Sequence, residues 1–280
     1  MVESTPGRYA TTSYSTLRLL ELQNWVEPFP RHWHDEWGIA VIEQGVNRFW
    51  YRGGWHDAPA GTIIVVPPGE IHDGGLAPDP WAERMSYVPV DTMEMIAQAC
   101  SERRQPLMFA SPIIRDESLA AELRALHRGL STPDSFKPDE GGELQVRVIG
   151  TLLERYGSVR VDVPRSDESV AIRRAKQFMG ERASTRIMLP EVADAVGLSL
   201  YHFIREFHKR VGMTPHAYLK QLRIMIAQRL LCSDDPISEV ALEAGFADQS
   251  HLTREFHRTI GVTPGAFRAA WPVQRSTFER

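Results

Sequence analysis

The chain has 280 residues, of which 42% are hydrophobic and 24% charged, as in an ordinary globular protein with room for two domains. Its polar start lacks the apolar core of a signal peptide, and no apolar run of about 18 residues occurs. Cys100 and Cys232 lie in different halves, which excludes a disulfide framework and a cysteine-rich metal site. We therefore expect a cytoplasmic protein that does not cross a membrane.

The net charge of −4 excludes a uniformly basic surface, but the charge is unevenly distributed. Residues 1–165 carry 16 Lys and Arg against 23 Asp and Glu, a net of −7, and residues 166–280 carry 16 against 13, a net of +3. The mildly basic C-terminal part has the sign that binding to a phosphate backbone requires.

Short β-rich runs separated by glycine and proline dominate residues 30–90. No helical period of useful length interrupts them, which favours a small antiparallel barrel or sandwich. The strands that we predict lie within 38–45, 46–54 and 61–72.

Amphipathic helices are predicted next, and one of them carries an apolar stripe. This stripe either packs on the barrel or forms a dimer interface, and the sequence supports both interpretations equally. The predicted helices lie within 92–104, 116–130 and 142–157. The stripe consists of Leu119, Leu123, Leu126 and Leu130.

A proline among polar residues at 161–167 indicates a linker, and helical periodicity continues beyond it. An all-α C-terminal domain behind a β-rich N-terminal domain places the chain in the α+β class. The helices that we predict after the linker span 167–183, 189–197, 199–211, 215–232, 237–245, 248–260 and 264–270.

A duplicated unit occupies this helical part, since the letters REFH occur at 205–208 and again at 254–257. The longer segments 191–215 and 239–264 also align, with one extra residue in the turn of the second copy. Each copy predicts a short helix, a turn with glycine, and a second helix, which together form a helix-turn-helix.

Capping residues and helical periodicity define the second helix of each copy. Ser199 and Asp248 are N-cap residues, and glycines follow both helices. At 100° per residue, phenylalanine or leucine faces the core while arginine and histidine face outward. The predicted inward residues are Phe203, Phe207, Leu252 and Phe256, and the outward ones are Tyr201, Arg205, His208, Ser250, Arg254 and His257.

Residues 170–270, with the two copies and the segment 210–231 between them, resemble the DNA-binding domain of AraC/XylS-type transcription regulators. The resemblance implies that one long helix joins two helix-turn-helix units, whose recognition helices enter successive major-groove segments of double-stranded DNA. It places base-facing residues at Tyr201, Ile204 and Arg205, and at Gln249, Ser250, His251 and Arg254, with Thr253 as a phosphate contact. Ile204 departs from the polar residue that is often found at its position.

Histidines mark the N-terminal part. Period-two alternation places His32, His34 and Glu36 on one face of a strand, and His72 follows in the spacing Gly61-x5-Pro67-x-Gly69-x2-His72. This spacing resembles the second motif of cupin barrels, while the usual glutamate of the first motif is missing. His32, His34 and His72 are weak candidates for metal ligands, and we predict no bound metal or cofactor. A further alternative is that these histidines have no role in binding.

The cupin resemblance implies an effector-binding barrel, with His32, His34, Glu36, His72 and Trp37 as candidate effector-binding residues. The tryptophans of this region either line a pocket or belong to the core. The predicted domains are a cupin-like barrel at 1–92, a helical linker or dimerisation region at 93–160, and the double helix-turn-helix domain at 167–272.

The resulting hypothesis is a non-enzymatic, homodimeric transcription regulator that binds a promoter, responds to a small-molecule effector and has RNA polymerase as a further partner. One alternative is a metal-dependent cupin enzyme fused to a DNA-binding domain. Another is a constitutive DNA-binding scaffold whose barrel binds no ligand.

Overall fold

The computed structural model describes residues 7–12, 15–76, 79–100, 107–132, 135–136, 138–159 and 169–270. The chain divides into two compact units. The first comprises residues 1–28, 33–161 and 266–280, and the second comprises 29–32 and 162–265. The predicted linker, 161–167, lies outside the described residues.

A six-stranded sheet with the order β1-β2-β9-β4-β7-β11 forms the centre of the first unit, and its strand pairs are antiparallel. Two of its strands, β1 and β2, precede the region in which the sequence predicts strands. The strands are β1 (Arg8–Thr12), β2 (Ser15–Trp25), β4 (Trp37–Gln44), β7 (Ile63–Val66), β9 (Trp81–Val88) and β11 (Ile113–Ile114).

A four-stranded sheet with the order β3-β8-β5-β6 complements the first sheet, and a short ladder joins β10 to β12. Among the described residues, the strands therefore form two main sheets, and no single closed ring of hydrogen-bonded strands is present. Their bounds are β3 (Phe29–His32), β5 (Val46–Tyr51), β6 (Gly54–Pro59), β8 (His72–Gly74), β10 (Leu107–Phe109) and β12 (Gly157–Val159).

Both faces of β4 are buried, which explains its nearly continuous apolar sequence. Trp37, Ile39 and Val41 belong to the core under the helices. Ala40 and Ile42 belong to a second core, which contains residues from both sheets. The alternation of side chains along a strand thus separates a helix-facing core from a core between the sheets.

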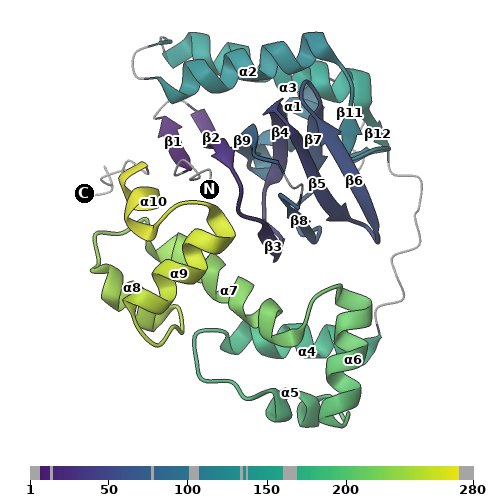
Figure 1. Cartoon of the computed structure of the whole chain (residues 1–280), viewed down its shortest axis with the longest axis vertical. Coiled ribbons are helices and arrows are strands. Elements are labelled where there is room, and N and C mark those ends of the chain that lie inside the picture. The colour runs from purple at the N-terminus through teal and green to yellow at the C-terminus, as the bar shows by residue number, and fades with distance from the viewer. Residues whose placement is uncertain are drawn as a thin grey trace. The chain divides into compact units, whose positions relative to one another are not determined.

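Three helices, α1 (Val90–Cys100), α2 (Glu117–Ser131) and α3 (Pro138–Tyr156), cover one face of the six-stranded sheet (Figure 1). Asp116 caps α2 by accepting a hydrogen bond from the backbone N–H of Leu119. The leucine stripe of α2 is at most 4% exposed and belongs to the core that these helices share with the sheet. The structure therefore supports packing within the domain for the stripe.

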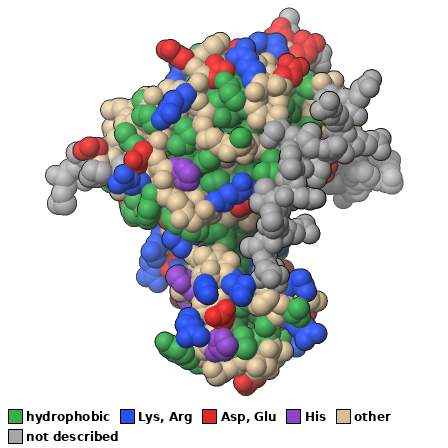
Figure 2. Space-filling view, turned by 90° about the vertical axis from the view of Figure 1, so that its right-hand side faces the viewer, with side chains coloured by type: hydrophobic (Ala, Val, Ile, Leu, Met, Phe, Trp, Pro, Cys, Tyr) green, Lys and Arg blue, Asp and Glu red, His purple; other side chains and the backbone are tan. Residues whose placement is uncertain are grey.

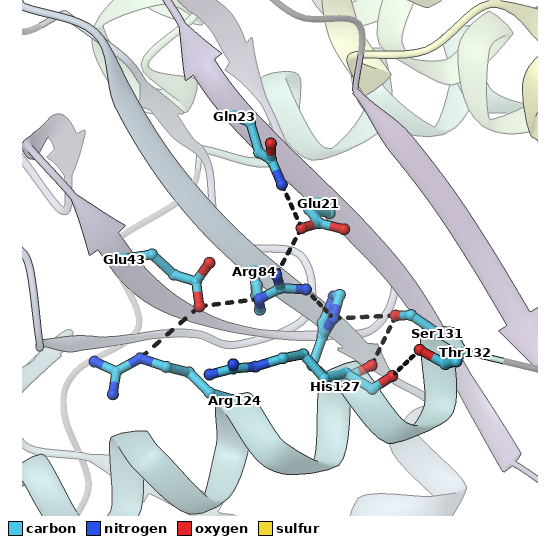
Figure 3. A network of polar contacts seen from close by, with 9 residues as sticks. Glu21, Gln23, Glu43, Arg84, Arg124, His127, Ser131 and Thr132 are labelled. Atoms are coloured by element: carbon cyan, nitrogen blue, oxygen red, sulfur yellow. Dashed lines mark hydrogen bonds and ion pairs between the residues drawn. The ribbon is translucent and has the colours of Figure 1, made fainter. Parts of the chain in front are cut away.

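A polar network lies between the sheet and α2 (Figure 3). The guanidinium of Arg84 donates to Glu21 at 2.6 Å and forms an ion pair with Glu43 at 3.0 Å. Nδ1 of His127, which is 1% exposed, lies 3.4 Å from Arg84 and 3.2 Å from the hydroxyl of Ser131. The network thus connects strands β2, β4 and β9 to helix α2 through polar and charged side chains.

His127 should make the stability of the first unit sensitive to acid. Burial and the neighbouring Arg84 lower its pKa from 6.5 to about 4. In the unfolded chain this histidine binds a proton below pH 6.5, whereas in the folded chain it binds one only below about pH 4. The free energy of unfolding therefore falls as the pH falls from 6.5 to about 4. As the pH is lowered through this window, the urea midpoint of unfolding should decline less steeply for His127→Gln than for the wild-type chain. A slope equal to that of the wild-type chain would contradict this prediction.

Residues 170–270 are helical, as predicted, and the observed helix ends lie within a few residues of the predicted ones. Among the described residues, no helix has the length and hydropathy that a membrane span requires. The helices of the C-terminal part are α4 (Val170–Arg182), α5 (Leu189–Ala195), α6 (Leu200–Val211), α7 (Pro215–Leu230), α8 (Ile237–Glu243), α9 (Gln249–Ile260) and α10 (Pro264–Ala270).

Candidate nucleic-acid interface and effector site

The first helix-turn-helix consists of α5 and α6. Ser199 caps α6 by accepting from the backbone N–H of His202, and the helix ends at Gly212, whose φ of 83° is left-handed. Phe203 and Phe207 are fully buried. Both caps and the inward face are therefore as the sequence predicts, and the opposite face of α6 is left to solvent.

The outer face of α6 carries an aromatic ring and a cation. Tyr201 is 76% exposed, and the guanidinium of Arg205 lies 5.9 Å from the centroid of its ring. This contact places a cation beside an aromatic ring one helical turn away. Ile204 is half-buried, so that only part of its side chain is available for contact.

The second helix-turn-helix consists of α8 and α9 and repeats these features. The carboxylate of Asp248 accepts from the backbone N–H of His251 at 2.7 Å, and α9 ends at Gly261 with a φ of 85°. Leu252 and Phe256 are fully buried. The two units thus have the same inward and outward faces.

The outer face of α9 is more polar than that of α6. Gln249, Ser250 and Arg254 are exposed. The half-buried ring of His251 packs edge-on against Phe246 with a centroid distance of 5.3 Å. The hydroxyl of Thr253 donates to the carbonyl of Gln249 at 2.8 Å, so a contact from this hydroxyl to phosphate would require breaking that bond. Lys, Arg and His side chains are visible on the surface of the helical unit in Figure 2.

A joint that the sequence analysis missed connects the two helix-turn-helix units through α7. Arg223 of α7 donates to the carbonyls of Ala183 and Thr185, which follow α4, at 2.8 and 2.9 Å. Lys220 of α7 forms an ion pair with Glu255 of α9 at 2.7 Å. Two side chains of α7, three residues apart, therefore link this helix to the end of α4 and to α9.

The histidine prediction needs a correction, because strand β3 ends at His32. His34 and Glu36 therefore lie in the turn after the strand and do not share a strand face with His32. The ring of His34 bonds to the carbonyl of Glu36, and its centroid lies 5.0 Å from that of His72 and 5.3 Å from that of Tyr87. Among the described residues, no three His, Cys, Asp or Glu side chains form a group that could hold a metal ion.

The other two candidate effector residues have different surroundings. Glu36 forms an ion pair with Arg18, a residue that the sequence analysis missed and whose guanidinium lies 5.3 Å from the ring centroid of Tyr87. Trp37 packs in the helix-facing core against Phe109 at a centroid distance of 5.6 Å. The structure thus groups Arg18, Glu36, His34, His72 and Tyr87, and places Trp37 in the other core.

The fold and these surfaces define a class: a DNA-binding protein with two helix-turn-helix units and a separate β-rich domain. The model of the AraC-like ligand binding domain matches residues 16–145, and the model of a helix-turn-helix domain matches residues 192–270. The chain belongs to the AraC family of transcription regulators, with an N-terminal ligand-binding domain and a C-terminal DNA-binding domain.

Known transcription regulators align with most of this chain. The HTH-type transcriptional regulator YbfI of Bacillus subtilis is 26% identical over 230 residues, which cover 81% of this chain and 82% of YbfI. The HTH-type transcriptional activator RhaS of Yersinia pestis is 22% identical, covering 80% and 83%. The structure of apo ToxT from Vibrio cholerae covers 94% of this chain and 100% of ToxT with a TM-score of 0.54 at 11% identity, which supports the fold.

Proposed function

We propose that this regulator binds a bipartite promoter site, with the outer faces of α6 and α9 in successive major-groove segments and with binding controlled by a small-molecule effector. The observation that carries the proposal is the pair of helices that each have a side-chain N-cap, a left-handed glycine C-cap, a buried apolar face and an outward arginine, Arg205 or Arg254. An outward arginine can form a two-pronged hydrogen bond with guanine O6 and N7.

The contacting residues that we propose are the predicted ones. Tyr201, Arg205, Gln249, Ser250 and Arg254 support the proposal most directly, because they are exposed. Ile204 and His251 are half-buried, so we assign them contacts at the edge of the interface, and Thr253 is assigned to phosphate.

The effector is proposed to bind between the two sheets of the N-terminal domain, where His34, His72 and Glu36 meet Arg18 and Tyr87. Transcription regulation by such a domain also implies contact with RNA polymerase. A homodimer would have to use surfaces other than the leucine stripe of α2, because that stripe is buried.

DNA recognition can be tested by letting the full chain select duplexes from a randomised pool. The variant Arg254→Ala then tests whether Arg254 contacts a base. On the selected site we expect Arg254→Ala to weaken binding by about 1–3 kcal/mol and to relax the preference at one base pair. The matched control is Arg128→Ala, because Arg128 is an exposed arginine on α2 in the other unit. Equal weakening on random DNA would assign Arg254 to phosphate, and enrichment of no sequence by the wild-type chain would disprove the proposal.

A further inference from the structure

Strand register sorts the side chains that face the space between the sheets into three layers across β2, β9 and β4. Leu17 and Leu19 of β2 belong to the helix-facing core, so the alternate residues of this strand point the other way. The polar layer is Arg18, Tyr87 and Gly38, the apolar layer is Leu20, Met85 and Ala40, and the acidic layer is Leu22, Glu83 and Ile42.

Glu83 of the acidic layer is only 5% exposed and has two apolar residues as its strand neighbours. Nδ2 of Asn47 donates to its Oε2 at 3.0 Å, and Nε1 of Trp81 donates to the same oxygen at 3.4 Å. Within the described part of the chain, no Lys or Arg forms an ion pair with Glu83, and the bonds from Asn47 and Trp81 both go to one oxygen, Oε2. Burial raises the pKa of this carboxyl.

A carboxylate at this position has two neutral hydrogen-bond donors, Asn47 and Trp81, but no cationic partner among the described residues. A buried charge is costly unless it is paired. The one cation of the three layers, Arg18, forms an ion pair with Glu36 and lies in the polar layer, on the far side of the apolar layer from Glu83. A ligand can supply the counter-charge that the described residues do not provide.

We propose that the effector of this regulator is a small organic ammonium compound, whose ammonium group binds Oε1 of Glu83 and whose apolar body lies along Leu20, Met85 and Ala40. The inference rests on the proposed function, because it assumes that the ligand-binding domain holds an effector between its sheets. Trp81 and Phe49 are the nearest aromatic neighbours along the strands, two residues from Glu83 and from Asn47, and aromatic faces attract organic cations. In the complex, one carboxylate faces one ammonium group, so that the two charges balance.

Three probes with the same carbon chain separate this ligand class from the alternatives: n-butylammonium, n-butanol and n-butyrate. A ligand that binds only the folded chain raises its melting temperature. With the full chain we expect a concentration-dependent rise with n-butylammonium and none with the other two. Glu83→Gln, which keeps the shape of the side chain and an oxygen for Asn47 and Trp81, should abolish the rise.

Glu70→Gln is the matched control, because it removes a carboxylate from a partly exposed ion pair of the same domain and should leave the rise unchanged. Glu83→Asp, which keeps the charge but shortens the side chain, should reduce the rise and serves if the glutamine variant does not fold. A rise that survives in Glu83→Gln, a preference for n-butyrate or n-butanol, or no rise with any probe would overturn the proposal. The DNA selection by the full chain is independent of these outcomes, so a failure of the amine site can be distinguished from a failure of the regulator.

Discussion

Replacing Phe256 with alanine should lower the free energy of unfolding of the helical unit by about 3–5 kcal/mol, the usual loss for a large aromatic side chain in a core. Phe256 is fully buried on the inner face of α9, and Leu252 and Ile260 of the same face are also buried. The truncation would leave a cavity that two neighbouring helices cannot fill without moving. Urea unfolding followed by the helical circular dichroism signal measures the change.

Phe207→Ala is the matched comparison, because Phe207 occupies the same position in the first unit, is also fully buried and lies 5.3 Å from Tyr218 between ring centroids. We expect a loss of the same size there. Arg254→Ala, on the outer face, should leave the unfolding midpoint unchanged. A folded, fully stable Phe256→Ala chain that only loses DNA binding would mean that the inner and outer faces have been assigned the wrong way round.

The sequence predicted the helical unit well because its signals are local. Ser199 and Asp248 cap their helices, and Phe203 and Phe256 are buried, as periodicity and capping chemistry indicate. Each of these features depends on residues within about one turn of each other along the chain. The duplication supported the prediction of two helix-turn-helix units further, since the same pattern of caps and apolar residues occurs twice.

Features that depend on distant residues could not be predicted in this way. The pairing of Arg18 with Glu36 and the enclosure of Glu83 by Asn47 follow from strand register, which single-strand patterns do not fix. The same holds for Arg223, whose carbonyl partners lie 38 and 40 residues away. The error at His34 had a local cause: alternation was extended beyond the end of β3.

Replacing Gly245 with alanine should disturb the joint around Arg223, because Gly245 lies against it. Gly245 and Gly197 occupy equivalent positions after the first helix of each unit, and both have left-handed φ angles, of 87° and 71°. A Cβ on Gly197 would meet no atom within 4 Å, whereas one on Gly245 would lie 2.9 Å from the carbonyl oxygen of Ala183 and 2.9 Å from Nε of Arg223. The second unit therefore approaches the end of α4 so closely that only glycine fits.

Gly197→Ala should cost about 1–2 kcal/mol of stability, the strain of a left-handed residue with a Cβ. Gly245→Ala should cost more, because the added methyl group also pushes a backbone carbonyl and the guanidinium that holds it. The displacement changes the separation of α6 and α9, since α7 carries both Arg223 and the ion pair of Lys220 with Glu255.

DNA sites with a changed spacing between their two halves can detect a changed separation of α6 and α9 independently of protein stability. The wild-type chain and Gly197→Ala should bind the selected site better than versions with one base pair inserted or removed between its halves. Gly245→Ala and Arg223→Ala should lose most of this preference for the native spacing while each half-site keeps its base preferences. If Gly245→Ala retains the wild-type spacing preference and is no less stable than Gly197→Ala, then the joint does not set the distance between the two recognition helices.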